Sequence, residues 1–180
     1  MAFLPHVANA SDERGGATAS EVGQVSAKIT GTSFLTADAE ASAAFYTRYL
    51  GVKILRDTVT ASPATKAVYG VPEVEELRVI LVVPAIWSKE DPNHLGIAFA
   101  EVGAQSDRPF PQQPDRRPRL GEPTLGFEVN DIEAVLKRME ADEVPIVVPL
   151  APSATGRSQA ITVFDPNGIR IQLYQYSEPR

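Results

Sequence analysis

The stretch that decides the fold runs from Asp38 to Tyr46 and has the sequence DAEASAAFY. Asp38 is a typical helix N-cap, and Ala41, Phe45 and Tyr49 follow at four-residue spacing on one helical face. Gly51 then stands where a helix commonly ends. We therefore predict an amphipathic helix between Asp38 and Gly51, preceded by a strand over residues 28–36 and followed by one over residues 52–60.

The same pattern begins again about half a chain length later. Asp131-Ile-Glu-Ala134 matches Asp38-Ala-Glu-Ala41, and Asp165-Pro-Asn167 matches Asp91-Pro-Asn93 just before the last strand of each half. Further strands are predicted over residues 76–86, 95–102, 124–129, 144–150, 160–164 and 169–174. Each half is therefore expected to run strand, helix, strand, strand, strand, which indicates an internal repeat of a βαβββ unit.

The repeat divides the chain into four parts. Residues 1–25 are small and polar and predict a flexible tail. Residues 26–102 form the first module and residues 122–180 the second, so residues 26–180 make one domain. Between them, residues 103–121 are rich in proline and arginine, which favours a linker or long surface loop over helix or central strand.

Composition excludes several classes of protein. The 180 residues contain no cysteine and two histidines, so disulfides, thiolate metal sites and cysteine nucleophiles are impossible. The net charge of −6 disfavours non-specific nucleic-acid binding. The apolar runs are too short to cross a bilayer, and the first residues lack a secretory signal. We expect a cytoplasmic protein that binds neither nucleic acid nor membrane.

The order of these motifs resembles the vicinal oxygen chelate superfamily, which includes glyoxalase I, bleomycin-resistance proteins and extradiol dioxygenases. The resemblance rests on DAEASAAFY with Leu50-Gly51 and on Phe127-Glu-Val-Asn-Asp131 with Asp165-Pro-Asn-Gly168. It implies an α+β fold in which two tandem βαβββ modules form a cup-shaped, barrel-like mixed sheet with the helices outside. It also implies a cavity for a small molecule and, in many members, a divalent metal.

The resemblance places the metal ligands at four positions, seven residues before each capping aspartate and seven after each turn aspartate. Here these positions hold Gly31, Ala98, Thr124 and Gln172. Two have no side-chain donor and two are neutral, whereas hard cations prefer carboxylates and transition metals prefer imidazole or thiolate. We therefore expect no metal and no other cofactor. His94 falls in a turn, where a surface histidine is the competing interpretation.

Strand alternation predicts which other side chains face the cup. If Thr124 and Gln172 point inward, the apolar residues of their strands pack against a helix, which makes the assignment self-consistent. The residues turned inward are then Ser33, Leu35, Ala98 and Ala100 in the first half and Thr124, Gly126, Glu128, Arg170, Gln172 and Tyr174 in the second.

Glu128, Arg170 and Tyr174 are the candidate catalytic residues among these. A buried glutamate near neutrality can act as a general base, and an arginine can compensate its charge. The competing interpretations are that Glu128 lies at the rim in an ion pair with Arg170, and that Tyr174 covers a sheet edge. The candidate ligand-binding residues are Ser33, Leu35, Arg78, Trp87, Ala98, Thr124, Gly126 and Gln172.

Arg78 and Trp87 depend on elements whose orientation stays open at this point. Arg78 shares a strand face with Ile80, and the sequence does not decide whether that face is inward. Trp87 follows an apolar run, where it closes the mouth of the cup over an aromatic ligand or serves ordinary packing. Residues 65–70 form either a lid or a plain surface excursion.

Three functions remain. The first is a metal-independent enzyme that acts on a small organic molecule, aromatic or carboxylate-bearing, by lyase or isomerase acid–base chemistry. The second is a non-catalytic binder of the bleomycin-resistance type, which sequesters its ligand. The third is a metal enzyme with displaced ligands, involving His94 and Glu101. The partner in each case is a small molecule, and the chain is a monomer or a homodimer.

Overall fold

The computed structural model describes residues 29–88, 95–103 and 120–177. The predicted tail over residues 1–25, nearly all of the predicted linker and both histidines, His6 and His94, lie outside these ranges. Within them, no helix is long and apolar enough to cross a membrane.

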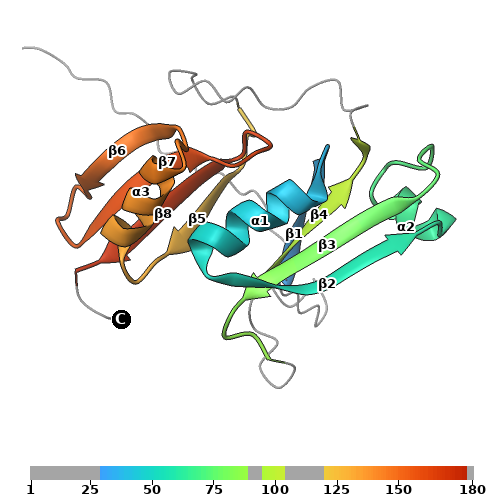
Figure 1. The fold of residues 1–180 in the computed structure, drawn as a ribbon, viewed down its shortest axis with the longest axis horizontal. Coiled ribbons are helices and arrows are strands. Elements are labelled where there is room, and N and C mark those ends of the chain that lie inside the picture. The colour runs from blue at the N-terminus through green and yellow to red at the C-terminus, as the bar shows by residue number, and fades with distance from the viewer. Residues whose placement is uncertain (1–28, 89–94, 104–119, 178–180) are drawn as a thin grey trace, which may run out of the picture.

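The two halves of the chain repeat the same order of elements, as predicted (Figure 1). A short helix, α2, is inserted in the first half after its second strand. The first half contains β1 (Gly31–Thr36), α1 (Ala39–Leu50), β2 (Val52–Thr60), α2 (Pro63–Val68), β3 (Leu77–Pro84) and β4 (Gly96–Glu101). The second contains β5 (Thr124–Glu128), α3 (Ile132–Ala141), β6 (Ile146–Pro152), β7 (Ser158–Phe164) and β8 (Arg170–Tyr176).

Each half forms one four-stranded mixed sheet. Sheet A has the strand order β1-β4-β3-β2, and sheet B has the matching order β5-β8-β7-β6. The first and last strands of each module pair in parallel, and the other neighbours are antiparallel. The identical strand order confirms the prediction of two tandem βαβββ modules.

Both long helices begin as the sequence predicts. The Asp38 carboxylate accepts a hydrogen bond from the backbone N–H of Ala41 at 2.8 Å, and Asp131 does the same for Ala134 at 2.9 Å. Such bonds satisfy donors that the first helical turn leaves free. Gly51 ends α1 in the left-handed region at φ 63°, which glycine adopts without steric cost.

One apolar core lies between the helices and the sheets of both modules. Tyr46 of α1 is at its centre, with its ring 5.0 Å from that of Phe99 in sheet A and 5.9 Å from that of Phe127 in sheet B. From α3, Ile132 and Met139 are fully buried in the same core. The two modules are therefore joined through the helix-bearing faces of their sheets.

Polar groups reinforce this junction at one place, which we call the seam: Thr36, Ser42, Tyr46, Asp165 and Asn167. The Tyr46 hydroxyl donates to Asp165 Oδ2 at 3.0 Å, and the Asn167 amide donates to the Ser42 hydroxyl at 3.0 Å. The Thr36 hydroxyl donates to Asn167 Oδ1 at 2.6 Å. The seam thus connects β1 and α1 to the turn between β7 and β8.

The barrel-like closure expected from the resemblance is not found in the residues that the structure describes. The two sheets lie side by side and remain separate, with α1 at the junction between them (Figure 1). The physical reason is that α1 packs on both modules, so the helix-bearing faces share a core. The opposite face of each sheet, turned away from α1 and α3, is not part of this core, and we call these two faces the inner faces.

Candidate functional site

The inner face of sheet A is built from small residues on two parallel strands. In the β1–β4 register, Gly31 is opposite Gly96, Ser33 is opposite Ala98, and Leu35 is opposite Ala100. The alternate residues of both strands face the core under α1. Ser33, Leu35 and Ala98 therefore lie on one face, as the alternation predicts.

One end of this face is covered by the segment that follows α2. Val71 is buried there with Ala98, Ala100 and Val79, and Tyr69 and Val74 pack against the same cluster. Residues 65–70 were predicted to form a lid or a surface excursion. Of these residues, Tyr69 packs with Val71 and Val74 against the Ala98–Ala100 part of β4, and the inner face near Gly31 is left uncovered by this segment.

A cavity of about 450 Å³ occupies that open end, and we call it the sheet A pocket. This volume is within the usual range for small-molecule sites. The predicted ligand-binding residues Ser33, Trp87 and Ala98 all line it. Its other lining residues include Gly31, Leu55, Leu81, Val83 and Gly96.

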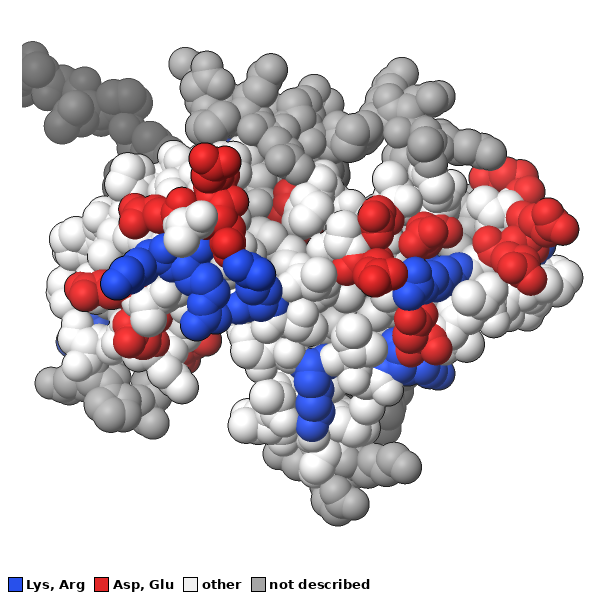
Figure 2. Space-filling model, viewed as in Figure 1, with Lys and Arg blue, Asp and Glu red and all other residues white. Residues whose placement is uncertain are grey.

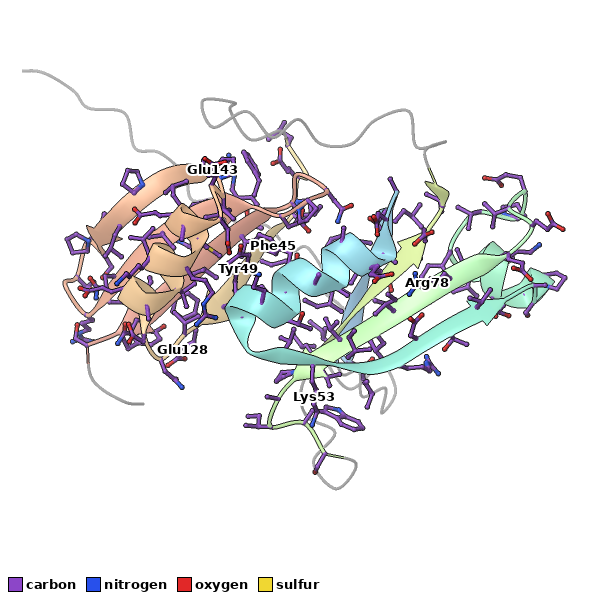
Figure 3. The ribbon with its side chains drawn as sticks, in the orientation of Figure 1. Phe45, Tyr49, Lys53, Arg78, Glu128 and Glu143 are labelled. Atoms are coloured by element: carbon purple, nitrogen blue, oxygen red, sulfur yellow. The ribbon has the colours of Figure 1, made fainter. Side chains whose placement is uncertain are left out.

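Trp87 is positioned by a lysine from the neighbouring strand. The Lys53 ammonium donates to the carbonyl oxygens of Ala85 at 2.9 Å and Trp87 at 3.1 Å. Lys53 is the second residue of β2 and lies beside the loop that follows β3 (Figure 3). The loop that holds the half-buried indole is thus tied to the sheet at two carbonyl groups.

The inner face of sheet B is more polar. Gly126 is opposite Gln172 and Glu128 is opposite Tyr174 in the β5–β8 register. A second cavity, of about 400 Å³, lies over β6, β7 and β8, and we call it the sheet B pocket. Gln172 and Tyr174, both predicted, line it together with hydroxyl-bearing residues: Ser153, Ser158, Thr162 and Tyr176.

The predicted pairing of Glu128 with Arg170 is wrong. Arg170 is opposite Thr124 at one end of β5, whereas Glu128 is at the other end. Four residues of extended chain separate the two positions by about 13 Å. The Arg170 guanidinium lies over the Phe164 ring, 5.1 Å from its centroid, and Glu128 borders a different hollow beside Phe127 and Leu95.

Arg78 lies on the opposite face from the other predicted ligand-binding residues. It shares the helix-bearing face of β3 with Ile80, and it forms ion pairs with Asp57 at 2.8 Å and Glu40 at 3.4 Å. Figure 3 shows Arg78 in the first module, well separated from Glu128 at the end of β5. The Arg78 guanidinium holds the pKa of the Asp57 carboxyl below its usual value.

Three further predicted residues lie on inner faces outside the two pockets. Leu35 is 48% exposed on β1. Thr124 and Gly126 lie on β5 beside the sheet B pocket without lining it. At Gly126 an added Cβ would only touch the Tyr174 ring, at 3.4 Å.

The four positions assigned to metal ligands do lie on the inner faces, but their side chains do not fit a metal. Gly31 and Ala98 line the sheet A pocket, and Gln172 lines the sheet B pocket. Across the described ranges, no three histidine, aspartate or glutamate side chains gather as a metal site would require. Glu101 is engaged elsewhere, since its carboxylate accepts from the N–H of Ala39 at 3.0 Å.

Sequence reasoning missed the apolar wall of the sheet A pocket. Leu55 reaches it because the β2–β3 register shifts between Ile54 and Arg56, which turns an additional side chain to the inner face. No residue type in that stretch indicates a bulge. Leu81 and Val83 could have been found, because their alternation with Ile80 and Val82 was visible once Ile80 was assigned to the core.

Charged side chains also gather on the helix-bearing face. Figure 2 shows acidic and basic residues next to each other there, over both modules. The Arg48 guanidinium of α1 donates two hydrogen bonds to the carboxylate of Asp142, which follows α3, at 2.6 and 2.7 Å. Hydrogen bonds from the Tyr49 hydroxyl and from Arg48 lower the pKa of the Asp142 carboxyl. This face supports the junction of the modules.

Comparison with known proteins gives one family. The family model described as the Glyoxalase/Bleomycin resistance protein/Dioxygenase superfamily matches residues 28–173. No curated protein sequence matches the chain.

Solved structures share the fold at low sequence identity. A glyoxalase family protein from Bacillus cereus is 14% identical, with a TM-score of 0.66 over 86% of this chain and 97% of its own. A glyoxalase/dioxygenase from Nostoc punctiforme is 15% identical, with a TM-score of 0.56 over 98% and 100%. The trypanothione-dependent glyoxalase I of Leishmania major is 19% identical, with a TM-score of 0.53 over 83% and 87%.

Proposed function

Because the chain belongs to the glyoxalase/bleomycin resistance protein/dioxygenase superfamily, we propose that it binds a small organic molecule on its inner sheet faces without a metal ion. The observation that supports this most is the position of the two cavities. Each lies on the inner face of one module, and their volumes of about 450 and 400 Å³ suit small molecules.

The proposed independence from metal follows from the donor set. Gly31 and Ala98 offer no side-chain ligand, and Thr124 and Gln172 offer only neutral oxygen or nitrogen atoms. Divalent ions that bind proteins tightly need carboxylate, imidazole or thiolate ligands. The chemistry of this chain would therefore depend on its own side chains.

Binding is favoured over acid–base catalysis by what lines the pockets. In the described parts of both linings there is no aspartate, glutamate, histidine, lysine or arginine. A general base at neutral pH is usually one of the first four of these groups. A sequestering role of the bleomycin-resistance type is thus the function that the geometry supports best.

A lyase or isomerase remains the second candidate, and Tyr174 is the observation in its favour. Its phenol lines the sheet B pocket beside Gln172, so a hydroxyl that can donate or accept a proton is within the site. Ligand recovered unaltered after long incubation supports the binder. Ligand recovered as a new compound, in amounts that Tyr174→Phe reduces, supports the enzyme.

The direct test is a small-molecule screen by native mass spectrometry on the full chain after treatment with a chelator. Ser33→Phe fills the sheet A pocket, and Gln172→Phe fills the sheet B pocket. Both side chains are exposed, so the fold should tolerate the change. Lys137→Phe, on the exposed side of α3, is the matched control.

We expect ligands that bind the chelated protein and are lost in one filling variant while Lys137→Phe keeps them. Ligands that need an added divalent ion would contradict independence from metal. Ligands unaffected by either filling variant would contradict the inner-face site. One chain already contains both pockets. Light scattering with and without ligand would show whether the protein is a monomer or a homodimer.

A further inference from the structure

We propose that the sheet A pocket takes an uncharged, flat, aromatic ligand that stacks on Trp87. This inference rests on the proposed function and adds the chemical class of the ligand to it.

The lining is neutral and largely apolar. Leu55, Leu81, Val83 and Trp87 form its walls, and the other polar side chains of the described lining are the hydroxyls of Thr30, Thr32 and Ser33. Moving an ionised carboxylate or ammonium out of water is costly unless an opposite charge compensates it. None of the described lining residues offers such a charge, so the pocket selects against ions of either sign.

Two basic residues of β2 lie nearby, but neither is among the described residues that line the pocket. The Lys53 ammonium already donates to two carbonyl groups, those of Ala85 and Trp87. Arg56 is opposite Leu81 on β2 but is exposed and does not line the pocket. Lys53 therefore fixes the loop, and neither basic residue is among the described residues that line the pocket.

The floor of the pocket favours a flat molecule. Gly31 and Gly96 are opposite each other at its base, and both lack side chains. A Cβ added at Gly31 would lie 2.8 Å from the Gly96 carbonyl oxygen, closer than real contacts allow. The two strands therefore approach with bare backbone at Gly31, and at Gly96 an added Cβ would lie 3.0 Å from the Leu81 side chain, so this part of the floor is low and suits a flat molecule.

Trp87 supplies the aromatic partner, and Lys53 acts as its positioning residue. Aromatic rings gain from offset or edge-to-face contact with a second ring in addition to the area they bury. An indole that is already fixed in place loses less conformational entropy when a ligand binds to it, and such preorganisation favours affinity. Trp87 is also the single tryptophan of the chain, so its indole N–H gives one isolated NMR signal.

Three probes of nearly equal shape test the charge selection: naphthylmethanol, naphthoate and naphthylmethylammonium. Their Kd values for the full chain are measured by calorimetry at neutral pH after chelation, and the Trp87 indole signal is followed in parallel. We expect the neutral alcohol to bind and to shift that signal. We expect each ion to bind at least about tenfold more weakly.

Equal or tighter binding of either ion at Trp87 would overturn the proposal. So would binding of the alcohol that leaves the Trp87 signal unchanged, or no binding of any probe. These failures are distinguishable from failure of the proposed function. If screened ligands remain sensitive to Ser33→Phe or Gln172→Phe, inner-face binding stands and only the neutral aromatic class is wrong.

The role of Lys53 has its own matched control. Lys66 makes the equivalent pair of bonds at the other end of the sheet, to the carbonyls of Val74 at 2.8 Å and Glu75 at 3.4 Å. Lys53→Met should raise the Kd of naphthylmethanol about threefold or more, Lys53→Arg should restore it, and Lys66→Met should leave it unchanged. Equal effects of Lys53→Met and Lys66→Met would show a general structural role and contradict positioning.

Discussion

The seam and the inner faces are two regions of one scaffold with opposite chemistry. At the seam, buried polar groups are fully engaged: Asp165 is 1% exposed and accepts bonds from Tyr46 and from the N–H groups of Asn167 and Ile169. On the inner faces, neutral side chains and bare glycine backbone border open cavities. Satisfied polar networks hold a structure together, whereas open neutral surface is available for a ligand.

This contrast predicts that changes at the seam act on stability and changes at the inner faces act on binding. The largest effects on stability are therefore expected at the seam.

The largest loss is expected for Tyr46→Ala. The ring is fully buried between Phe99 and Phe127, and its removal leaves a cavity shared by both modules. We expect the free energy of unfolding to fall by about 3–5 kcal/mol, measured by urea denaturation. Ser33→Phe on the inner face should change it by less than about 1 kcal/mol. Comparable losses in both variants would remove the division between the regions.

The next effect compares two glycines, Gly31 at the start of β1 and Gly126 in the middle of β5, each on an edge strand of its sheet. Gly31→Ala places a Cβ 2.8 Å from the Gly96 carbonyl oxygen, and overpacking of this kind costs about 1–3 kcal/mol. Gly126→Ala meets only the Tyr174 ring at 3.4 Å, so its effect should stay within about 0.5 kcal/mol. Urea midpoints that coincide for the two variants would show that sheet A lacks its close strand contact.

The pH dependence of stability should separate two aspartates that join the modules. Burial raises the pKa of Asp165, so the stability it contributes is fully present below about pH 4 and declines as the pH rises through its folded pKa. The bonds from Tyr49 and Arg48 lower the pKa of Asp142, so its contribution is present above about pH 4 and is lost as the pH falls.

Urea unfolding of Asp165→Asn and Asp142→Asn across this range measures both contributions. The difference from wild type should shrink with rising pH for Asp165→Asn and shrink with falling pH for Asp142→Asn. The same sign of pH dependence in both variants would contradict the contrast between the buried and the exposed contact.

The smallest effect is expected for Arg48→Met. Its guanidinium is mostly exposed, with 57% of the side chain accessible, and exposed ion pairs contribute little and are screened by salt. The variant should lose only a small part of the wild-type stability, and the difference should vanish in concentrated sodium chloride. A large loss that persists in salt would place this contact with the seam.

The sequence predicted the modules well because their signals are local. Asp38 and Gly51 bound α1 through cap geometry that involves residues a few positions away. Strand alternation also placed Ser33, Ala98, Gln172 and Tyr174 on the inner faces, since that period depends only on the strand itself.

The errors concern relations between strands and between modules. Glu128 and Arg170 share a face, but the parallel β5–β8 register separates them by four positions. No residue in either strand indicates that register in the sequence. Leu55 enters the pocket through a register shift, and Arg78 faces α1 because it alternates in phase with Ile80 and Val82, which pack in the core under that helix. The hydrogen bond from Tyr46 to Asp165 joins the α1 motif to the turn before β8. Both motifs were recognised in the sequence, but nothing in the sequence indicated that they are in contact.

The central claim is that a neutral ligand occupies the sheet A pocket without a metal. A crystal structure of the chelated full chain grown with naphthylmethanol tests it most directly. We predict electron density for the ring against Trp87, above Gly31 and Gly96, with no metal in contact with it. Density on another surface, or a ligand held through a metal ion, would contradict the account.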